Sequence, residues 1–149
     1  MTNDKIAILF IELADVMEIA GENPFKIRSY RKAAENIVKL QMSISEMSVD
    51  DIEAIPGVGK AISEKIQAAI ETGTFPALEK WRATGYHTLM PLIKIDGLTP
   101  RKLSNLVKRS KIENLDDIKS MVDKGEFQRF DVIEPELKDA ILNFILFRR

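Results

Sequence analysis

Ile55-Pro56-Gly57-Val58-Gly59-Lys60 connects two segments whose apolar residues recur at helical spacing. Its two glycines permit a tight turn with positive φ and let another backbone approach closely. The helix that follows begins with backbone N–H groups that have no partner inside the helix, and the helix dipole adds partial positive charge there. These features predict a hairpin that holds an anion such as a phosphodiester, with Lys60 as a mobile positive charge beside it.

Contacts from such a hairpin reach the phosphate backbone of DNA and not the edges of its bases. They position a protein on DNA without reading sequence, and the binding they give is strongly salt-dependent. A nucleotide-binding P-loop is excluded, because the four residues it requires between its first glycine and Gly-Lys are missing. The alternative interpretation is an ordinary connection between helices in which glycine only turns the chain.

Two helices are expected before this hairpin. Apolar residues from Ile6 to Met17 recur on one face, and Gly21 supplies a left-handed C-terminal stop. Asn23-Pro24 then provides a cap and a first-turn proline for a second helix. Between residues 25 and 40 this segment carries five basic residues against Glu35, a net charge of +4. A solvated helix face would explain such a run as well as a nucleic-acid contact would.

The remaining sequence also predicts helices. They are expected over residues 49–54, capped by Ser48, over 62–72, 75–84 and 89–94, after Pro100, from Asn114 to Gly125, and after Pro135. No alternation of apolar and polar residues persists long enough for a strand. The fold class is therefore all-α.

A second, weaker hairpin motif, Ile95-Asp96-Gly97-Leu98-Thr99, follows about 40 residues after the first. The pair predicts two small helical domains, residues 1–86 and 87–149, each with one hairpin between helices. In the second motif Thr99 replaces a glycine, and Pro100 removes a backbone N–H from the expected anion site. Lys102 is then the nearby charge, and a purely structural hairpin is the alternative to a phosphate contact.

Composition narrows the class of protein. Of 149 residues, 45% are hydrophobic and 30% are charged, which predicts a folded globular chain. The lack of cysteine excludes disulfides, thiolate nucleophiles and the usual structural zinc sites. No apolar run approaches the length of a membrane span, and acidic residues interrupt the N-terminal apolar stretch, so we expect a cytoplasmic protein with no membrane partner. The net charge of −1 gives no overall sign of a nucleic-acid partner.

Three stretches together resemble the N-terminal region of the family X DNA polymerases, the DNA polymerase beta-like group, especially its bacterial and archaeal members. They are Asn23-Pro24-Phe25-Lys26-Ile27-Arg28-Ser29-Tyr30-Arg31-Lys32-Ala33-Ala34, the first hairpin motif, and Glu64-Lys65-Ile66 followed by Thr72-Gly73. The resemblance covers nearly the whole chain. Residues up to about Tyr86 are similar to the small lyase-type domain, and the remainder is similar to the hairpin-bearing subdomain that follows it.

The resemblance implies non-sequence-specific DNA binding in repair, at gaps, nicks, 5′-phosphate ends or junctions of single-stranded and duplex DNA. The hairpins and the resemblance together predict these DNA-binding residues: Lys26, Tyr30, Arg31, Gly57, Val58, Gly59, Lys60, Gly97, Thr99 and Lys102. The resemblance also implies a Na or K ion held by the carbonyls of Ile55 and Val58, and no required cofactor. A polymerase palm has no room after Arg149, so we expect no polymerase activity.

Some members of this family remove a 5′-deoxyribose phosphate through a Schiff base, and the matching nucleophile position here is Lys65. Such an amine must be neutral at working pH, which requires partial burial or a cationic neighbour. Helical geometry places Lys65 at the edge of an apolar face, beside Ala61 and Ala68, which are too small to cover it. A surface lysine on a helix flank is the alternative interpretation.

The residues expected around this lysine are incomplete. Lys26 and Tyr30 match assisting positions, but Ala61 stands where a second lysine is expected, and Thr74 and Ala77 replace basic residues after the helix. A third interpretation, supported by the near-neutral net charge and by Thr99, is a protein-interaction module that kept the fold and lost DNA binding. His87 has no cysteine or second histidine with which to share a metal. The scattered aromatic residues predict packing positions: Tyr86, Trp81, Phe127 and Phe130.

Overall fold

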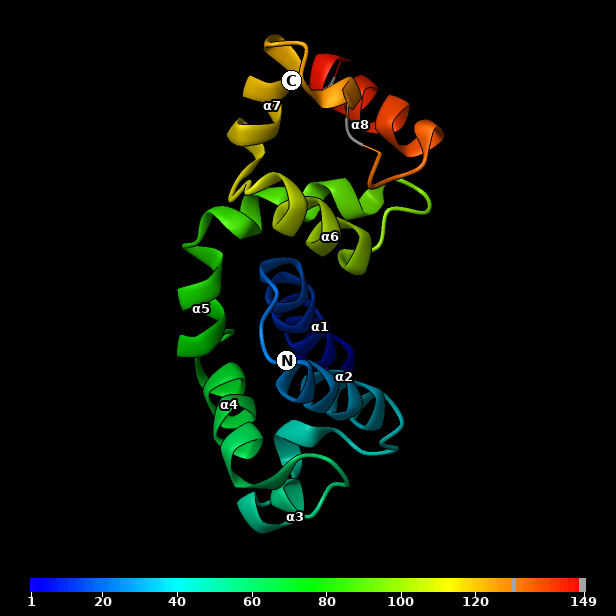
Figure 1. The fold of residues 1–149 in the computed structure, drawn as a ribbon. Helices are drawn as coiled ribbons and strands as arrows, with labels where there is room; N and C mark the ends of the chain where they lie inside the picture. Colours follow the sequence, from blue (N-terminus) through cyan, green and yellow to red (C-terminus); the bar gives the residue numbers. More distant parts are fainter. Residues whose placement is uncertain (130, 148–149) are drawn as a thin grey trace. The chain divides into compact units, whose positions relative to one another are not determined.

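The computed structural model describes residues 1–129 and 131–147, and all regular elements in those ranges are helical (Figure 1). The α-helices are α1 (Asn3–Ala20), α2 (Pro24–Val38), α3 (Val49–Glu53), α4 (Gly59–Thr72), α5 (Pro76–Arg82), α6 (Pro100–Ser110), α7 (Leu115–Asp123) and α8 (Pro135–Phe147). The 3-10 helices of the same ranges are η1 (Ile44–Glu46), η2 (Gly85–Lys94) and η3 (Phe127–Arg129). The prediction of an all-α fold is confirmed.

Local signals in the sequence set several of these helix ends. The Asn23 side chain accepts a hydrogen bond from the Phe25 N–H at 2.8 Å, and the Ser48 hydroxyl accepts one from the Asp51 N–H at 3.1 Å. Gly73 ends α4 with a φ of +85°. The two side chains bond N–H groups that a helix N-terminus leaves without a partner, and Gly73 adopts the left-handed conformation that ends a helix.

The described chain forms two compact units. The first unit comprises Met1–Met17 and Glu22–Ala83, and the second comprises Glu18–Gly21 and Thr84–Arg149. Glu18–Gly21 includes the last turn of α1, where Ile19 is fully buried in the core of the second unit. One continuous helix therefore supplies residues to both cores.

The core of the first unit is centred on Phe10 of α1. This fully buried ring stacks on Tyr30 of α2 at 6.0 Å between centroids and on Phe75 at 5.1 Å. Arg82 of α5 forms a bidentate pair with Glu12 of α1, with N–O distances of 2.6 and 2.7 Å. Offset aromatic contacts and a paired charge of this kind hold helices together more specifically than apolar area does.

The second unit differs from the sequence prediction at one helix. The helix expected over residues 89–94 is a 3-10 helix, η2, that begins earlier, at Gly85. Pro91 lies inside it and disfavours the α-helical alternative, because proline has no N–H and its ring clashes with the carbonyl four residues before. Among the aromatic residues expected to pack, Phe127 is buried and Trp81 and Tyr86 are partly buried, whereas Phe130 lies outside the described residues.

Gly85 lies where η2 meets the loop before α7. A Cβ at this position would be 2.6 Å from the Glu113 carbonyl oxygen and 3.0 Å from the Asn114 Cβ. Backbone cannot yield as the end of a long side chain can, so we expect Gly85→Ala to lower the free energy of unfolding by about 2–3 kcal/mol. Thermal unfolding followed by circular dichroism measures this loss.

Gly125→Ala is the control for that substitution. Its Cβ would meet no heavy atom within 4 Å, so only the positive φ of +71° opposes it. We expect it to cost about 1 kcal/mol. Equal losses in the two variants would show that the contact with residues 113 and 114 is unimportant.

Candidate nucleic-acid interface

The first hairpin, residues 54–59, joins α3 to α4. The Val58 N–H donates to the Ile55 carbonyl at 3.0 Å and closes the turn, while the side chains of Ile55 and Val58 are buried. Gly57 and Gly59 have φ values of +84° and +63°. Both glycines therefore occupy the left-handed region that disfavours other residues.

Both glycines are required for their φ angles, and Gly57 also has little space for a side chain. A Cβ on Gly57 would lie 3.2 Å from the Lys32 Cγ of α2, so this backbone approaches α2 closely. A Cβ on Gly59 would meet nothing within 4 Å, so Gly59 is needed for its φ angle and not for space. The motif thus combines a turn requirement with a packing requirement.

The N-terminus of α4 is open to solvent and has no side-chain cap. Its N-cap residue, Val58, offers no oxygen to the first amides, and Gly59 and Lys60 are exposed. Uncapped amides at a helix N-terminus attract an anion, and the Lys60 ammonium adds charge at the same place. The predicted residues Gly57, Val58, Gly59 and Lys60 all lie at this helix start, and their contact with DNA remains a prediction.

Asn36 of α2 holds the hairpin from the other side. Its side-chain amide donates to the Pro56 carbonyl at 2.5 Å. Because the peptide is trans and planar, the N–H of Gly57 points away from Asn36. Sequence reasoning missed this residue, since only packing brings it to the hairpin.

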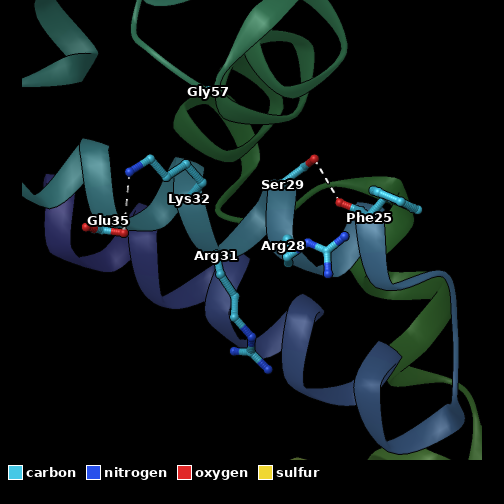
Figure 2. A pocket seen from close by; sticks show the side chains of 7 residues that line it. All are labelled: Phe25, Arg28, Ser29, Arg31, Lys32, Glu35 and Gly57. Carbon is cyan, nitrogen blue, oxygen red and sulfur yellow. Dashed lines mark hydrogen bonds and ion pairs between the residues drawn. The ribbon is translucent and has the colours of Figure 1, made fainter.

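The basic run of α2 is divided between two faces of the helix. One face borders an open groove of about 520 Å³, which we call the α2 groove; its lining residues are Phe25, Arg28, Ser29, Arg31, Lys32, Glu35 and Gly57. Figure 2 shows this groove, with Lys32 reaching toward Glu35 and Ser29 bonded to the Phe25 carbonyl. The other face of α2, with Lys26 and Tyr30, borders a separate cavity.

Arg31 has a structural contact as well as a place in the groove. Its guanidinium pairs with the Asp15 carboxylate of α1 at 2.8 Å, and the Asp15 side chain is only 15% exposed. This partly buried pair ties α2 to α1. Phosphate binding by Arg31 remains a prediction, and it would have to share the guanidinium with Asp15.

The Lys65 cavity, of about 360 Å³, gathers several residues from α2, α4 and α5. Its lining residues are Leu13, Met17, Glu22, Lys26, Tyr30, Lys65, Ala77, Lys80 and Trp81. The Lys65 ammonium lies over the Tyr30 ring, 5.8 Å from its centroid. Burial raises the pKa of Tyr30 above its ordinary value, so its hydroxyl, which is protonated at neutral pH in any case, stays protonated to higher pH.

Lys80 is the residue of this cavity that sequence reasoning missed. It lies three positions after Ala77 in α5, and both residues line the cavity. Residues three apart share a helix face, so spacing from Ala77 could have identified it. Lys80 supplies a positive charge about one helical turn after Ala77, the position at which the resemblance implies a basic residue.

The second hairpin differs from the first where the sequence differs. The Thr99 hydroxyl accepts a hydrogen bond from the Lys102 N–H at 3.2 Å and so caps α6. The Lys102 ammonium pairs with Glu134 at 3.2 Å, and Gly97 has a φ of +85°. This side-chain cap and a nearby carboxylate compete with any anion, which favours the structural interpretation of the second hairpin.

Two further observations concern the described residues as a whole. No group of three or more His, Cys, Asp or Glu side chains among them could hold a metal ion. None of their helices is both long enough and apolar enough to cross a membrane.

The comparisons with known proteins agree with the resemblance found in the sequence. The family model of the helix-hairpin-helix domain matches residues 1–75. Over 128 residues the chain is 31% identical to the DNA polymerase/3'-5' exonuclease PolX of Bacillus subtilis (strain 168), covering 86% of this chain and 22% of that protein. The chain thus spans about a fifth of the length of this relative, and the predicted resemblance is confirmed.

Proposed function

This chain belongs to the helix-hairpin-helix domain family, and from that premise we propose that it binds DNA backbone phosphate through its first hairpin. Binding is independent of base sequence and is directed to gaps, nicks or other 5′-phosphate ends in DNA repair. The observation that carries the proposal is the uncapped, exposed N-terminus of α4, with Lys60 beside it. Amides at such a helix end recognise phosphate and leave base edges unread.

The Lys65 cavity supports recognition of the 5′-phosphate end. Lys26, Lys65 and Lys80 line one concave site together with Tyr30, and Glu22 is the acidic residue of the same lining. A terminal phosphate carries more negative charge than an internal phosphodiester, so a cluster of cations favours the end of a strand. The hairpin would hold the backbone, and the cavity would hold the end.

A monovalent cation at the hairpin is part of the proposal. The Ile55 carbonyl accepts the Val58 N–H and keeps a second lone pair for an ion. A Na or K ion on the carbonyls of Ile55 and Val58 would add positive charge beside the phosphate. No other cofactor is needed for binding.

Fluorescence anisotropy with a gapped duplex that carries a 5′-phosphate tests the proposed function. We expect salt-sensitive binding by the unmodified chain and about tenfold weaker binding by Lys60→Glu, because a phosphate contact is replaced by repulsion. Lys5→Glu, an exposed position on α1 with the same change in charge, is the matched control. A gapped duplex with a 5′-hydroxyl shows how much the 5′-phosphate contributes to the affinity. Tetramethylammonium chloride in place of KCl shows how much the monovalent cation at the hairpin contributes.

Two outcomes would contradict the proposal. If the unmodified chain does not bind any of these DNAs at low salt, DNA binding is wrong and the fold serves a protein partner. If Lys60→Glu and Lys5→Glu weaken binding equally, the first hairpin is not the phosphate site.

A second candidate function, removal of 5′-deoxyribose phosphate, is favoured by the position of Lys65. Its side chain is partly buried in the cavity that also holds Lys26, Tyr30 and Lys80. A primary amine placed beside a phosphate-binding cluster is suited to form a Schiff base with the aldehyde of an opened sugar. Ala61 and Ala77 leave this cluster with fewer cations than the resemblance implies, and Lys80 partly replaces them.

A further inference from the structure

The α2 groove adjoins the first hairpin and is held against it. Gly57 belongs to both features, and the Asn36 amide ties the Pro56 carbonyl to α2 at 2.5 Å. Lys32 comes so close to Gly57 that a Cβ there would lie 3.2 Å from its Cγ. The groove and the first hairpin therefore share Gly57 and lie next to each other.

Arg28 and Lys32 give this groove its positive charge. Among the described residues Arg28 has no carboxylate within ion-pair distance, and its guanidinium lies 4.7 Å from the centre of the Phe25 ring. The Lys32 side chain is 59% exposed, and its ammonium lies 3.9 Å from the Glu35 carboxylate. The Lys39 ammonium is closer to that carboxylate, at 3.1 Å. Both cations are thus available to an incoming anion at little cost, because exposed ion pairs are weak.

We propose that the α2 groove binds a second backbone phosphate of the DNA strand held by the first hairpin, through Arg28 and Lys32. This inference rests on the proposed function and extends it from one phosphate to two phosphates of the same strand. A DNA strand carries a phosphate about every 3.4 Å along the duplex axis, so a phosphate at the hairpin always has neighbours within reach. Asn36 is a positioning residue, because it keeps the groove and the hairpin in register.

The salt dependence of binding counts the phosphates that a protein neutralises. We expect Arg28→Gln and Lys32→Gln each to reduce the slope of log K against log salt by about 0.7–0.9, since each loses one contact. Lys5→Gln, which removes the same charge from an exposed position on α1 outside the groove, should leave the slope unchanged. Anisotropy titrations of a gapped duplex over a range of KCl concentrations give these slopes.

Glu35→Gln tests the same site by a gain of affinity. Glu35 lines the groove, and its bond to Lys39 together with the charge of Lys32 lowers the pKa of its carboxyl. Removing this exposed carboxylate should strengthen binding about twofold to fivefold without disturbing the fold. Such a gain cannot come from a variant that has unfolded.

The outcomes separate this inference from the proposed function. Failure of the unmodified chain to bind DNA would overturn both. Normal binding by the unmodified chain, with slopes of Arg28→Gln and Lys32→Gln equal to that of Lys5→Gln, would overturn the groove alone. Reduced slopes in the two groove variants, with tighter binding by Glu35→Gln, would establish the second phosphate position.

Discussion

Sodium borohydride should trap a covalent complex between this chain and DNA with a 5′-deoxyribose phosphate, and Lys65→Ala should reduce it to background. In this reaction the Lys65 amine adds to the C1′ aldehyde of the opened sugar and loses water to form an imine. Borohydride then reduces the imine to a stable secondary amine. The complex migrates as a slower band in a denaturing gel.

The structure makes Lys65 the expected nucleophile of the three lysines in the cavity. Its side chain is partly buried and lies over the Tyr30 ring, whereas Lys26 and Lys80 are exposed. We expect Lys80→Ala to weaken trapping through poorer phosphate binding, so that more protein restores the band. Lys65→Ala should not recover in this way, because the reacting atom itself is missing.

Lys5→Ala is the control for a general loss of charge and should trap as well as the unmodified chain. Trapping that persists in Lys65→Ala would show that another amine forms the Schiff base. An absence of trapping by the unmodified chain, with normal DNA binding, would leave a DNA-binding module without lyase activity.

Phe10→Ala should lower the free energy of unfolding of the first unit by about 3–5 kcal/mol. The ring is fully buried and stacks on both Tyr30 and Phe75, so its removal leaves a cavity between α1, α2 and the start of α5. The substitution also removes the stacking partner that holds the ring of Tyr30, a residue that lines the Lys65 cavity. We therefore expect weaker binding of a 5′-phosphate end even under conditions in which the variant is folded.

Urea unfolding followed through Trp81, the single tryptophan of the chain, reports on the first unit. Ile8→Ala, on the same helix but 59% exposed, is the matched control and should change stability by less than about 0.5 kcal/mol. Comparable losses in the two variants would mean that the Phe10 ring is not the centre of this core.

Features of the site that depend on neighbouring residues could be predicted from the sequence, and those that depend on packing could not. The first hairpin could be predicted because its turn depends on two glycines and on helix ends only a few residues away. The helix predicted near residues 89–94 is present, but it is a 3-10 helix that begins earlier, at Gly85, and Pro91 disfavours an α-helix there. For the second hairpin the sequence allows both a phosphate contact and a structural turn, and in the structure Thr99 acts there as a helix cap.

The sequence by itself determined the all-α fold, the helix caps at Asn23 and Ser48, the glycine turn of the first hairpin and the family resemblance. Each of these depends on residues within a turn or two of one another, where side-chain type and backbone conformation are directly linked.

Only the tertiary structure decided which charges are paired and which are available. Arg31 meets Asp15, Asn36 meets Pro56 and Lys102 meets Glu134 across separations of 16 to 32 residues. The same holds for Lys80 in the Lys65 cavity and for Ile19 in the second core. Such contacts depend on how whole helices pack, and helical periodicity indicates which face of a helix is buried but not which neighbour buries it.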